Sequence, residues 1–317
     1  MDEMQSLPPD THIGSVHLKV SNLKKSLSFY VDILGFKEVE WESEPGAASE
    51  QTAETVLLSA DGNYPALILL TEQPEAIQKP KYTTGLYHIA IRVPSQRALG
   101  KELAHVQQMG WRFDGAADHL VSEALYLADP DGNGLEIYAD RERERWPYSG
   151  DQVVMATEPL DVDGLMRAAA ESEPSYEGIH PNTVIGHVHL QVADLSQAES
   201  FYHGLLGFDI TQRSYPGALF LSAGGYHHHI GLNIWAGKGA TPPPPNAVGL
   251  KSFTIVIPNG EAWQYVLDRL QKASVAIEAW HSEGGLVKAL VEDPFQNGVE
   301  LAVEKDLLSS RNVGAKL

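Results

Sequence analysis

Three consecutive histidines, His227, His228 and His229, stand well inside the chain, in the stretch GGYHHHIGLNIW at 224–235. Imidazole nitrogens bind transition metals and exchange protons near neutral pH, so such a run can serve a metal site or acid–base chemistry. The apolar residues beside the run predict a strand. Because alternate residues of a strand share a face, we expect His227 and His229 to point together and His228 to point away and be structural.

The composition restricts which metal sites and partners are possible. The 317-residue chain has no cysteine, so a metal must be held by histidine and carboxylate side chains. Its formal net charge of −19 disfavours nucleic-acid binding. No apolar run approaches the roughly 18 residues of a membrane span, and the N-terminus is acidic and polar. We therefore expect a cytoplasmic protein with small-molecule partners and no membrane contact.

The sequence repeats itself in two halves. The segment at 14–37, GSVHLKVSNLKKSLSFYVDILGFK, returns at 186–209 as GHVHLQVADLSQAESFYHGLLGFD, which aligns His17 with His189. Agreement at this density indicates a duplication.

A second pair of segments supports the duplication. LADPDGNGLEIYAD at 127–140 matches VEDPFQNGVELAVE at 291–304, which aligns Glu136 with Glu300. Within each half, a strand, a helix and three further strands occur twice. The predicted fold is therefore α+β, with four βαβββ modules. Residues 10–145 and 183–305 are predicted to form two domains of two modules each, joined by an acidic linker from about 141 to 183.

These motifs resemble a known family. The module order, the helix ends SFYxxxLGF and the strand DPDGNGLEIY resemble the vicinal oxygen chelate superfamily, which includes glyoxalase I, fosfomycin-resistance proteins and type I extradiol dioxygenases. The segments GLYHIAIRVP, SEALYLADPDGNGLEIYADR and SAGGYHHHIGLNIWAG together resemble the bacterial catechol 2,3-dioxygenase group more narrowly. The resemblance implies cupped half-barrels, each built from two modules, with a divalent metal inside. It also places metal ligands on the first strand of each module and on the last strand of the second module.

Only the second module has both a histidine and a carboxylate at the ligand positions that the resemblance implies, namely His88 and Glu136. The candidates at these positions on all four modules are, on first strands, His17, His88, His189 and Ser252, and, on last strands, Leu69 or a near neighbour, Glu136, Asn233 and Glu300. Two histidines and one carboxylate are the set that suits Fe(II), with Mn(II) as an alternative.

The third ligand depends on how the modules pair. Sequential pairing gives His17, and cross-pairing of the second and third modules gives His189. The resembled dioxygenases carry an acid/base histidine on a late strand of the module that supplies the first metal histidine, and His229 stands in roughly that place. We therefore predict His88, Glu136 and His189 as metal ligands and His229 as the acid/base residue.

The resemblance implies a non-haem Fe(II)-dependent extradiol dioxygenase that acts on catechol or a substituted catechol with O2. Two other functions stay open: a glyoxalase-like or thiol-transferase metalloenzyme, and a metal-free protein that sequesters an aromatic ligand. Sheet edges in this fold could also pair in a homo-oligomer.

Overall fold

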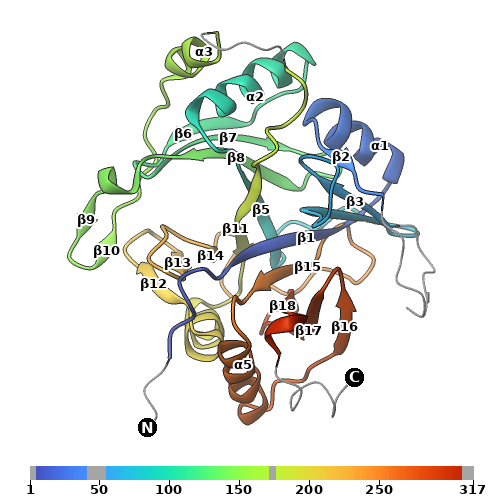
Figure 1. Ribbon diagram of the computed structural model, residues 1–317, viewed down its shortest axis with the longest axis vertical. Helices are drawn as coiled ribbons and strands as arrows, with labels where there is room; N and C mark the ends of the chain where they lie inside the picture. Colours follow the sequence, from blue (N-terminus) through green and yellow to red (C-terminus); the bar gives the residue numbers. More distant parts are fainter. Residues whose placement is uncertain (1–4, 41–54, 171–175, 309–317) are drawn as a thin grey trace.

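Two eight-stranded sheets form the protein (Figure 1). The computed structural model describes residues 5–40, 55–170 and 176–308. The first sheet has the order β16-β17-β18-β15-β1-β4-β3-β2, and the second has the order β12-β13-β14-β11-β5-β8-β7-β6. The predicted α+β fold of four βαβββ modules in two half-barrels is confirmed.

The strands of the first sheet come from the two ends of the chain. They are β1 (His12–Val20), β2 (Lys37–Glu38), β3 (Thr55–Ser59), β4 (Ile68–Glu72), β15 (Gly249–Val256), β16 (Ala279–Glu283), β17 (Leu286–Glu292) and β18 (Gly298–Glu304). The strands of the second sheet come from the middle of the chain. They are β5 (Gly85–Arg92), β6 (Gly115–Asp118), β7 (Ser122–Ala128), β8 (Gly134–Asp140), β11 (Val184–Gln191), β12 (Asp209–Gln212), β13 (Ala218–Ser222) and β14 (Ile230–Asn233).

Five α-helices and a short two-stranded ribbon complete the described fold. The helices are α1 (Leu23–Leu27), α2 (Gln96–Gln108), α3 (Val162–Ala170), α4 (Leu195–Glu199) and α5 (Gly260–Lys272), and the ribbon is β9 (Tyr148–Ser149) with β10 (Gln152–Val153). α2 packs on β8, and α5 packs on β18. These helices cover one face of each sheet, so the opposite, concave face is left for a site.

The modules pair across the two halves. β5 of the second module is antiparallel to β11 of the third, and β1 of the first module is antiparallel to β15 of the fourth. Cross-pairing is therefore confirmed, and the sequential pairing of the first two modules does not occur. Residues 10–145 contribute one module to each sheet, and so do residues 183–305. That each range forms a separate domain stays a prediction.

Local sequence signals explain where the first helix begins and ends. The side chain of Asn22 accepts a hydrogen bond from the backbone N–H of Lys25 and caps α1, as an N-cap asparagine does. Gly35 has a φ of +73°, which glycine adopts without strain, and ends the helical segment. Between them, residues Ser28–Ile33 form a π-helical turn, a departure from the regular helical spacing that the sequence predicts. The third module repeats this arrangement with a π-helical turn at Ser200–Leu206.

Alternation along β8 separates the core from the site. Leu135, Ile137 and Ala139 belong to the main hydrophobic core, whereas Glu136 and Tyr138 lie on the other face of the strand. Both of these polar residues are also buried. In the described part of the chain, no helix is both long and apolar enough to span a membrane.

Candidate metal centre

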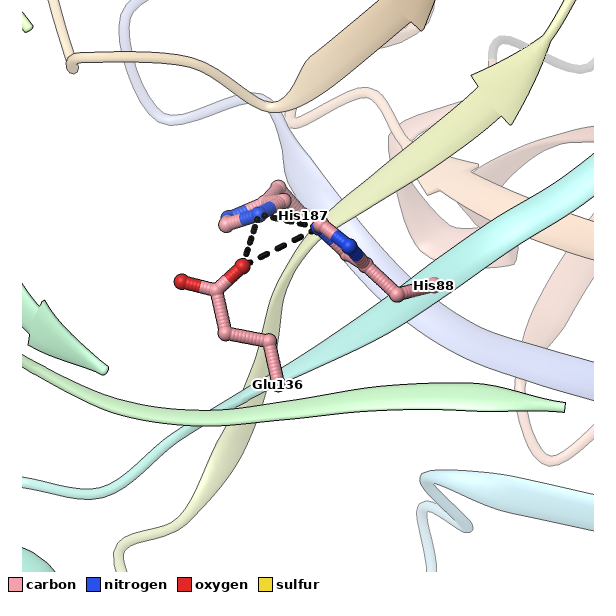
Figure 2. A group of neighbouring side chains, drawn as sticks. All are labelled: His88, Glu136 and His187. Atoms are coloured by element: carbon pink, nitrogen blue, oxygen red, sulfur yellow. Dashed lines mark hydrogen bonds and ion pairs between the residues drawn. The ribbon is translucent and has the colours of Figure 1, made fainter. Parts of the chain in front are cut away.

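Two imidazoles and one carboxylate converge on the concave face of the second sheet. His88 lies on β5, Glu136 on β8 and His187 on β11, and their side chains point toward one another in Figure 2. Oε2 of Glu136 lies 3.0 Å from Nε2 of His88 and 3.3 Å from Nε2 of His187. The two Nε2 atoms are 3.4 Å apart. One ligand atom from each residue is therefore directed at a common point.

The register of three neighbouring strands brings these ligands together. Ala90 on β5 is paired with Glu136 on one side and with His187 on the other, and His88 lies two residues before Ala90 on the same face. Ala90 is fully buried, and its small side chain leaves the space above it to the three ligands. A bulge between Ile185 and His187 sets the position of His187 on β11.

The charges of the group fit a bound cation. Burial alone would raise the pKa of Glu136, but the adjacent His187 and His88 hold that pKa well below its usual range, so the carboxylate is ionised. Burial lowers the pKa of His187 to about 4, so its imidazole is neutral near pH 7. None of the residues that line the surrounding cavity in the described chain is lysine or arginine. A buried carboxylate beside imidazole nitrogens suits a divalent metal ion.

The corresponding place in the first sheet has different side chains around its carboxylate. Ser252 and Thr254 of β15 occupy the register positions of His88 and Ala90, and Glu300 of β18 occupies that of Glu136. Both hydroxyls donate to Glu300 at 3.0 Å. Nζ of Lys288 lies 3.4 Å from Glu300 and neutralises it. The first sheet thus provides a cation from its own chain and has Ser252 and Ser15 at the positions of His88 and His187.

A cavity of about 250 Å³ lies over the candidate metal group, which consists of His88, Glu136 and His187. Aromatic and apolar side chains form much of its wall, and further polar groups face it. The wall consists of Tyr87, Val121, Met155, Ala156, Tyr215, Phe220 and Trp235, and the polar groups besides the three candidate ligands are His119, Ser122, Tyr126, Thr157, His189 and His228. The cavity can therefore accept a small, mostly apolar molecule with a few polar substituents.

Two of the predicted ligands, His88 and Glu136, belong to the group, but the third position is occupied by His187 instead of His189. His189 is paired with His88 in the register, and its ring centroid lies 4.9 Å from that of His88. Its Nε2 is buried and has no hydrogen-bond partner in the described structure. His189 lines the cavity beside the metal group without joining it.

The other alternative, His17, lies in the first sheet. It is paired with Ser252, and its Nε2 lies 2.7 Å from Oγ1 of Thr71. His17 occupies the register position of His189, whereas Ser15 corresponds to His187. Because its sheet contains neither His88 nor Glu136, His17 does not complete the metal group.

The histidine triplet lies before the strand in which it was expected, and the member that faces the metal cavity is His228 instead of His229. β14 begins only at Ile230, and before it His227 and His229 form bends. His228 lines the metal cavity, with its ring centroid 3.9 Å from that of His187. His229, the predicted acid/base residue, lines a different cavity of about 450 Å³, and its Nδ1 accepts a hydrogen bond from the backbone N–H of Ala223 at 3.1 Å.

The sequence contained a signal for His187. HIAIRV in the second module and HVHLQV in the third share the pattern of a histidine followed by alternating apolar residues, and this alignment places His88 on His187. Comparing the first and third modules alone directs attention to His189, because the first module has Ser15 at the ligand position.

Two further polar residues of the cavity were not predicted as site residues. Nδ1 of His119 donates to the carbonyl oxygen of Ala156 at 2.6 Å, and Nε2 of His119 lies 2.5 Å from the hydroxyl of Tyr126. Burial, followed by the nearby Glu136, raises the pKa of Tyr126 well above its usual range. The linker between the halves also contributes, because Met155 and Ala156 line the cavity.

Comparison with known proteins agrees with the fold and the repeat. The sequence profile of the Glyoxalase/Bleomycin resistance protein/Dioxygenase superfamily matches residues 12–137 and 184–301, which is more than half of the chain. The chain belongs to this superfamily. It is similar to a protein of Bacillus subtilis (strain 168) named catechol-2,3-dioxygenase, with 44% identity over 279 residues that cover 87% of this chain and 93% of the relative.

Solved structures share the fold at low sequence identity. A putative dioxygenase from Bacillus subtilis aligns with a TM-score of 0.63 and 12% identity over 95% of this chain and 86% of that chain. Glyoxalase I from Zea mays aligns with a TM-score of 0.57 and 16% identity over 94% of both chains. At these identities the likeness concerns the fold alone.

Proposed function

We propose that this chain is a non-haem Fe(II)-dependent extradiol dioxygenase that opens the ring of catechol or a substituted catechol with O2. The observation that carries the proposal is the set of two histidines and one carboxylate on the floor of a largely apolar cavity. The 44% identity to a protein named catechol-2,3-dioxygenase supports the same activity.

His88, Glu136 and His187 are the proposed ligands, with His187 in place of His189. Each offers one ligand atom, and these atoms lie within 4.8 Å of one another. When bound, Fe(II) would supply Lewis-acid activation of the two diol oxygens and a site at which O2 can react. Mn(II) fits the same nitrogen and oxygen ligands.

His228 is the proposed acid/base residue, in place of His229. Burial, and then the neighbouring His187, lower the pKa of His228 well below its usual range, so its imidazole is neutral and offers a lone pair to which a diol hydroxyl can donate. Its side chain lines the cavity that contains the metal group.

Tyr126 and the apolar wall have separate proposed roles. The raised pKa of Tyr126 keeps its hydroxyl protonated. Because Nδ1 of His119 donates to Ala156, the Tyr126 hydroxyl donates to Nε2 of His119, and the phenol oxygen can accept a hydrogen bond from a substrate hydroxyl. Phe220, Trp235 and Met155 present apolar surface that packs on an aromatic ring and excludes water.

Anaerobic reconstitution with Fe(II) tests the proposal. After the addition of catechol and air, visible absorbance is expected to show a yellow ring-opened product, with O2 consumed in proportion to catechol. Parallel samples with Mn(II) and Zn(II) show whether formation of the product requires a redox-active metal ion or only a bound divalent cation.

The same experiment distinguishes the two other functions. If Fe(II) binds but neither catechol nor simple alkyl catechols give the product, a glyoxalase-like or thiol-transfer reaction takes the place of ring cleavage. If the protein binds catechols with unchanged affinity after His88→Ala and takes up no metal, it is a sequestration protein.

A further inference from the structure

A buried chain of hydrogen bonds connects the metal cavity to a carboxylate behind it. Nε2 of His227 lies 3.0 Å from Oδ1 of Asp140, and Nδ1 of His227 lies 2.8 Å from Nδ1 of His228. His227 is fully buried, and only His228 of the three lines the cavity. Asp140 lies on β8, on the same face as Glu136 and four residues beyond it.

Asp140 is held as an acceptor by several donors. Arg92 on β5 donates from Nη1 to Oδ2 at 3.2 Å, and the hydroxyl of Tyr226 lies 3.0 and 3.1 Å from the two carboxylate oxygens. Burial would raise the pKa of Asp140, but His227 and Arg92 lower it below its usual value. The carboxylate is therefore ionised and can only accept hydrogen bonds.

The direction of each hydrogen bond follows from this acceptor. Because Asp140 cannot donate, the proton of the first bond is on Nε2 of His227. When the imidazole of His227 is neutral and protonated at Nε2, its lone pair is at Nδ1, and Nδ1 of His227 then accepts from His228. Nδ1 of His228 then holds the proton, and its Nε2, on the other side of the ring from His227, holds a lone pair.

We propose that Asp140 and His227 are positioning residues that fix the tautomer of His228, so that its Nε2 is the nitrogen which accepts a proton from the diol. The inference deepens the proposed function and rests on it for the role of His228. It also gives two of the three consecutive histidines distinct tasks: His227 sets a tautomer, and His228 presents a lone pair to the cavity.

The hydrogen bonds that run from residue 140 through His227 to His228 form a relay. The Asp140→Asn variant reverses the direction of this relay, while the side chain at position 140 keeps its shape. Arg92 can only donate, so the oxygen of the substituted amide stays toward Arg92 and the amide NH2 group faces His227. This NH2 group donates to Nε2 of His227 and moves the proton of His227 to Nδ1. Nδ1 of His228 must then accept, and its proton moves to Nε2, where it blocks the acceptor.

The first readout is independent of activity. In Zn(II)-loaded protein with ¹⁵N-labelled histidine, NMR is expected to show His228 protonated at Nδ1 in the wild type and at Nε2 in Asp140→Asn. A wild-type spectrum with His228 protonated at Nε2 would overturn the inference, whether or not the protein cleaves catechol. An inactive wild type with His228 protonated at Nδ1 would contradict the proposed function alone.

The second readout is the kinetics of the Fe(II) protein. Asp140→Asn is expected to lower kcat by about 100-fold or more, as misplaced tautomers do elsewhere, while KM changes by less than about threefold. Tyr226→Phe is the matched control, because it removes another hydrogen bond to Asp140 but leaves the relay, and its kcat should stay within about threefold of the wild type. His227→Phe should lower kcat as Asp140→Asn does, with little further loss in the double variant.

Two kinetic outcomes would also overturn the inference. One is a kcat for Asp140→Asn within about threefold of the wild type at full iron content. The other is an equal loss of kcat in Tyr226→Phe, which would mean that the carboxylate has a general structural role instead of setting the tautomer.

Discussion

At the residue scale, two histidine pairs show how adjacent residues of the same type acquire different surroundings. His187 joins the metal group, whereas His189, two residues on, only borders it. His228 faces the metal cavity, and His229 faces another cavity. The residue types were readable from the sequence, but their directions were not. His228 and His229 lie on opposite sides, but the side toward the metal cavity belongs to His228, because β14 begins only after the triplet and its register could not be predicted.

The assignment of the acid/base role predicts a contrast between His228 and His229. His228→Gln removes the proposed proton acceptor and should lower kcat for catechol by about 100-fold or more. His229→Gln changes a residue outside the metal cavity and should leave kcat within about tenfold of the wild type. Steady-state kinetics at equal iron content measure both. Equal losses in the two variants would contradict the role of His228.

At the element scale, β11 positions its ligand through a bulge at a glycine. A Cβ atom at Gly186 would overlap the hydroxyl oxygen of Tyr138 and lie 2.7 Å from the adjoining ring carbon. Tyr138 is fully buried, so it cannot move away without disturbing the sheet. The repeat and the strand order of the modules could be predicted from the sequence, but this bulge could not, because it depends on contact between β11 and β8, which are far apart in the chain.

This contact predicts that Gly186→Ala destabilises the protein by about 1–3 kcal/mol through overpacking and weakens metal binding by displacing His187. Chemical denaturation and metal titration measure the two effects. Adding Tyr138→Phe removes the nearest atom and should restore part of the stability. Gly115→Ala on β6 is the matched control, since a Cβ atom there meets nothing within 4 Å. Equal destabilisation by both alanine substitutions would contradict the account of the bulge.

At the scale of the whole molecule, duplication has produced two cups with one candidate metal centre among the described residues. The second sheet combines two imidazoles with Glu136, and the first sheet neutralises Glu300 with Lys288. Sequence alone left the pairing of modules open, because both pairings supply a histidine for the third ligand position. The pairing of β5 with β11 decides it, and it makes the site depend on both halves of the chain.

Buried neutral histidines predict acid sensitivity of the whole fold. Burial lowers the pKa of His229 to about 3, against an ordinary value of 6.5. Between these two pH values the unfolded chain binds a proton at this residue that the folded protein does not bind. The free energy of unfolding therefore falls as pH decreases below about 6.5, by up to about 1.4 kcal/mol per pH unit for this residue.

Denaturant unfolding of the wild type and His229→Gln from pH 7 to pH 4 measures this effect. The variant should lose less stability over this range, because glutamine does not titrate. Parallel stability curves for the two proteins would show that His229 does not contribute to acid sensitivity.

The most direct test of the central claim is the Fe(II) affinity of His187→Ala and His189→Ala, measured by anaerobic titration against the wild type. Two imidazoles and a carboxylate from β5, β8 and β11 are claimed to hold the metal. The account predicts that His187→Ala weakens Fe(II) binding by more than about 100-fold, whereas His189→Ala weakens it by less than about tenfold. Retained affinity in His187→Ala together with its loss in His189→Ala would contradict the account.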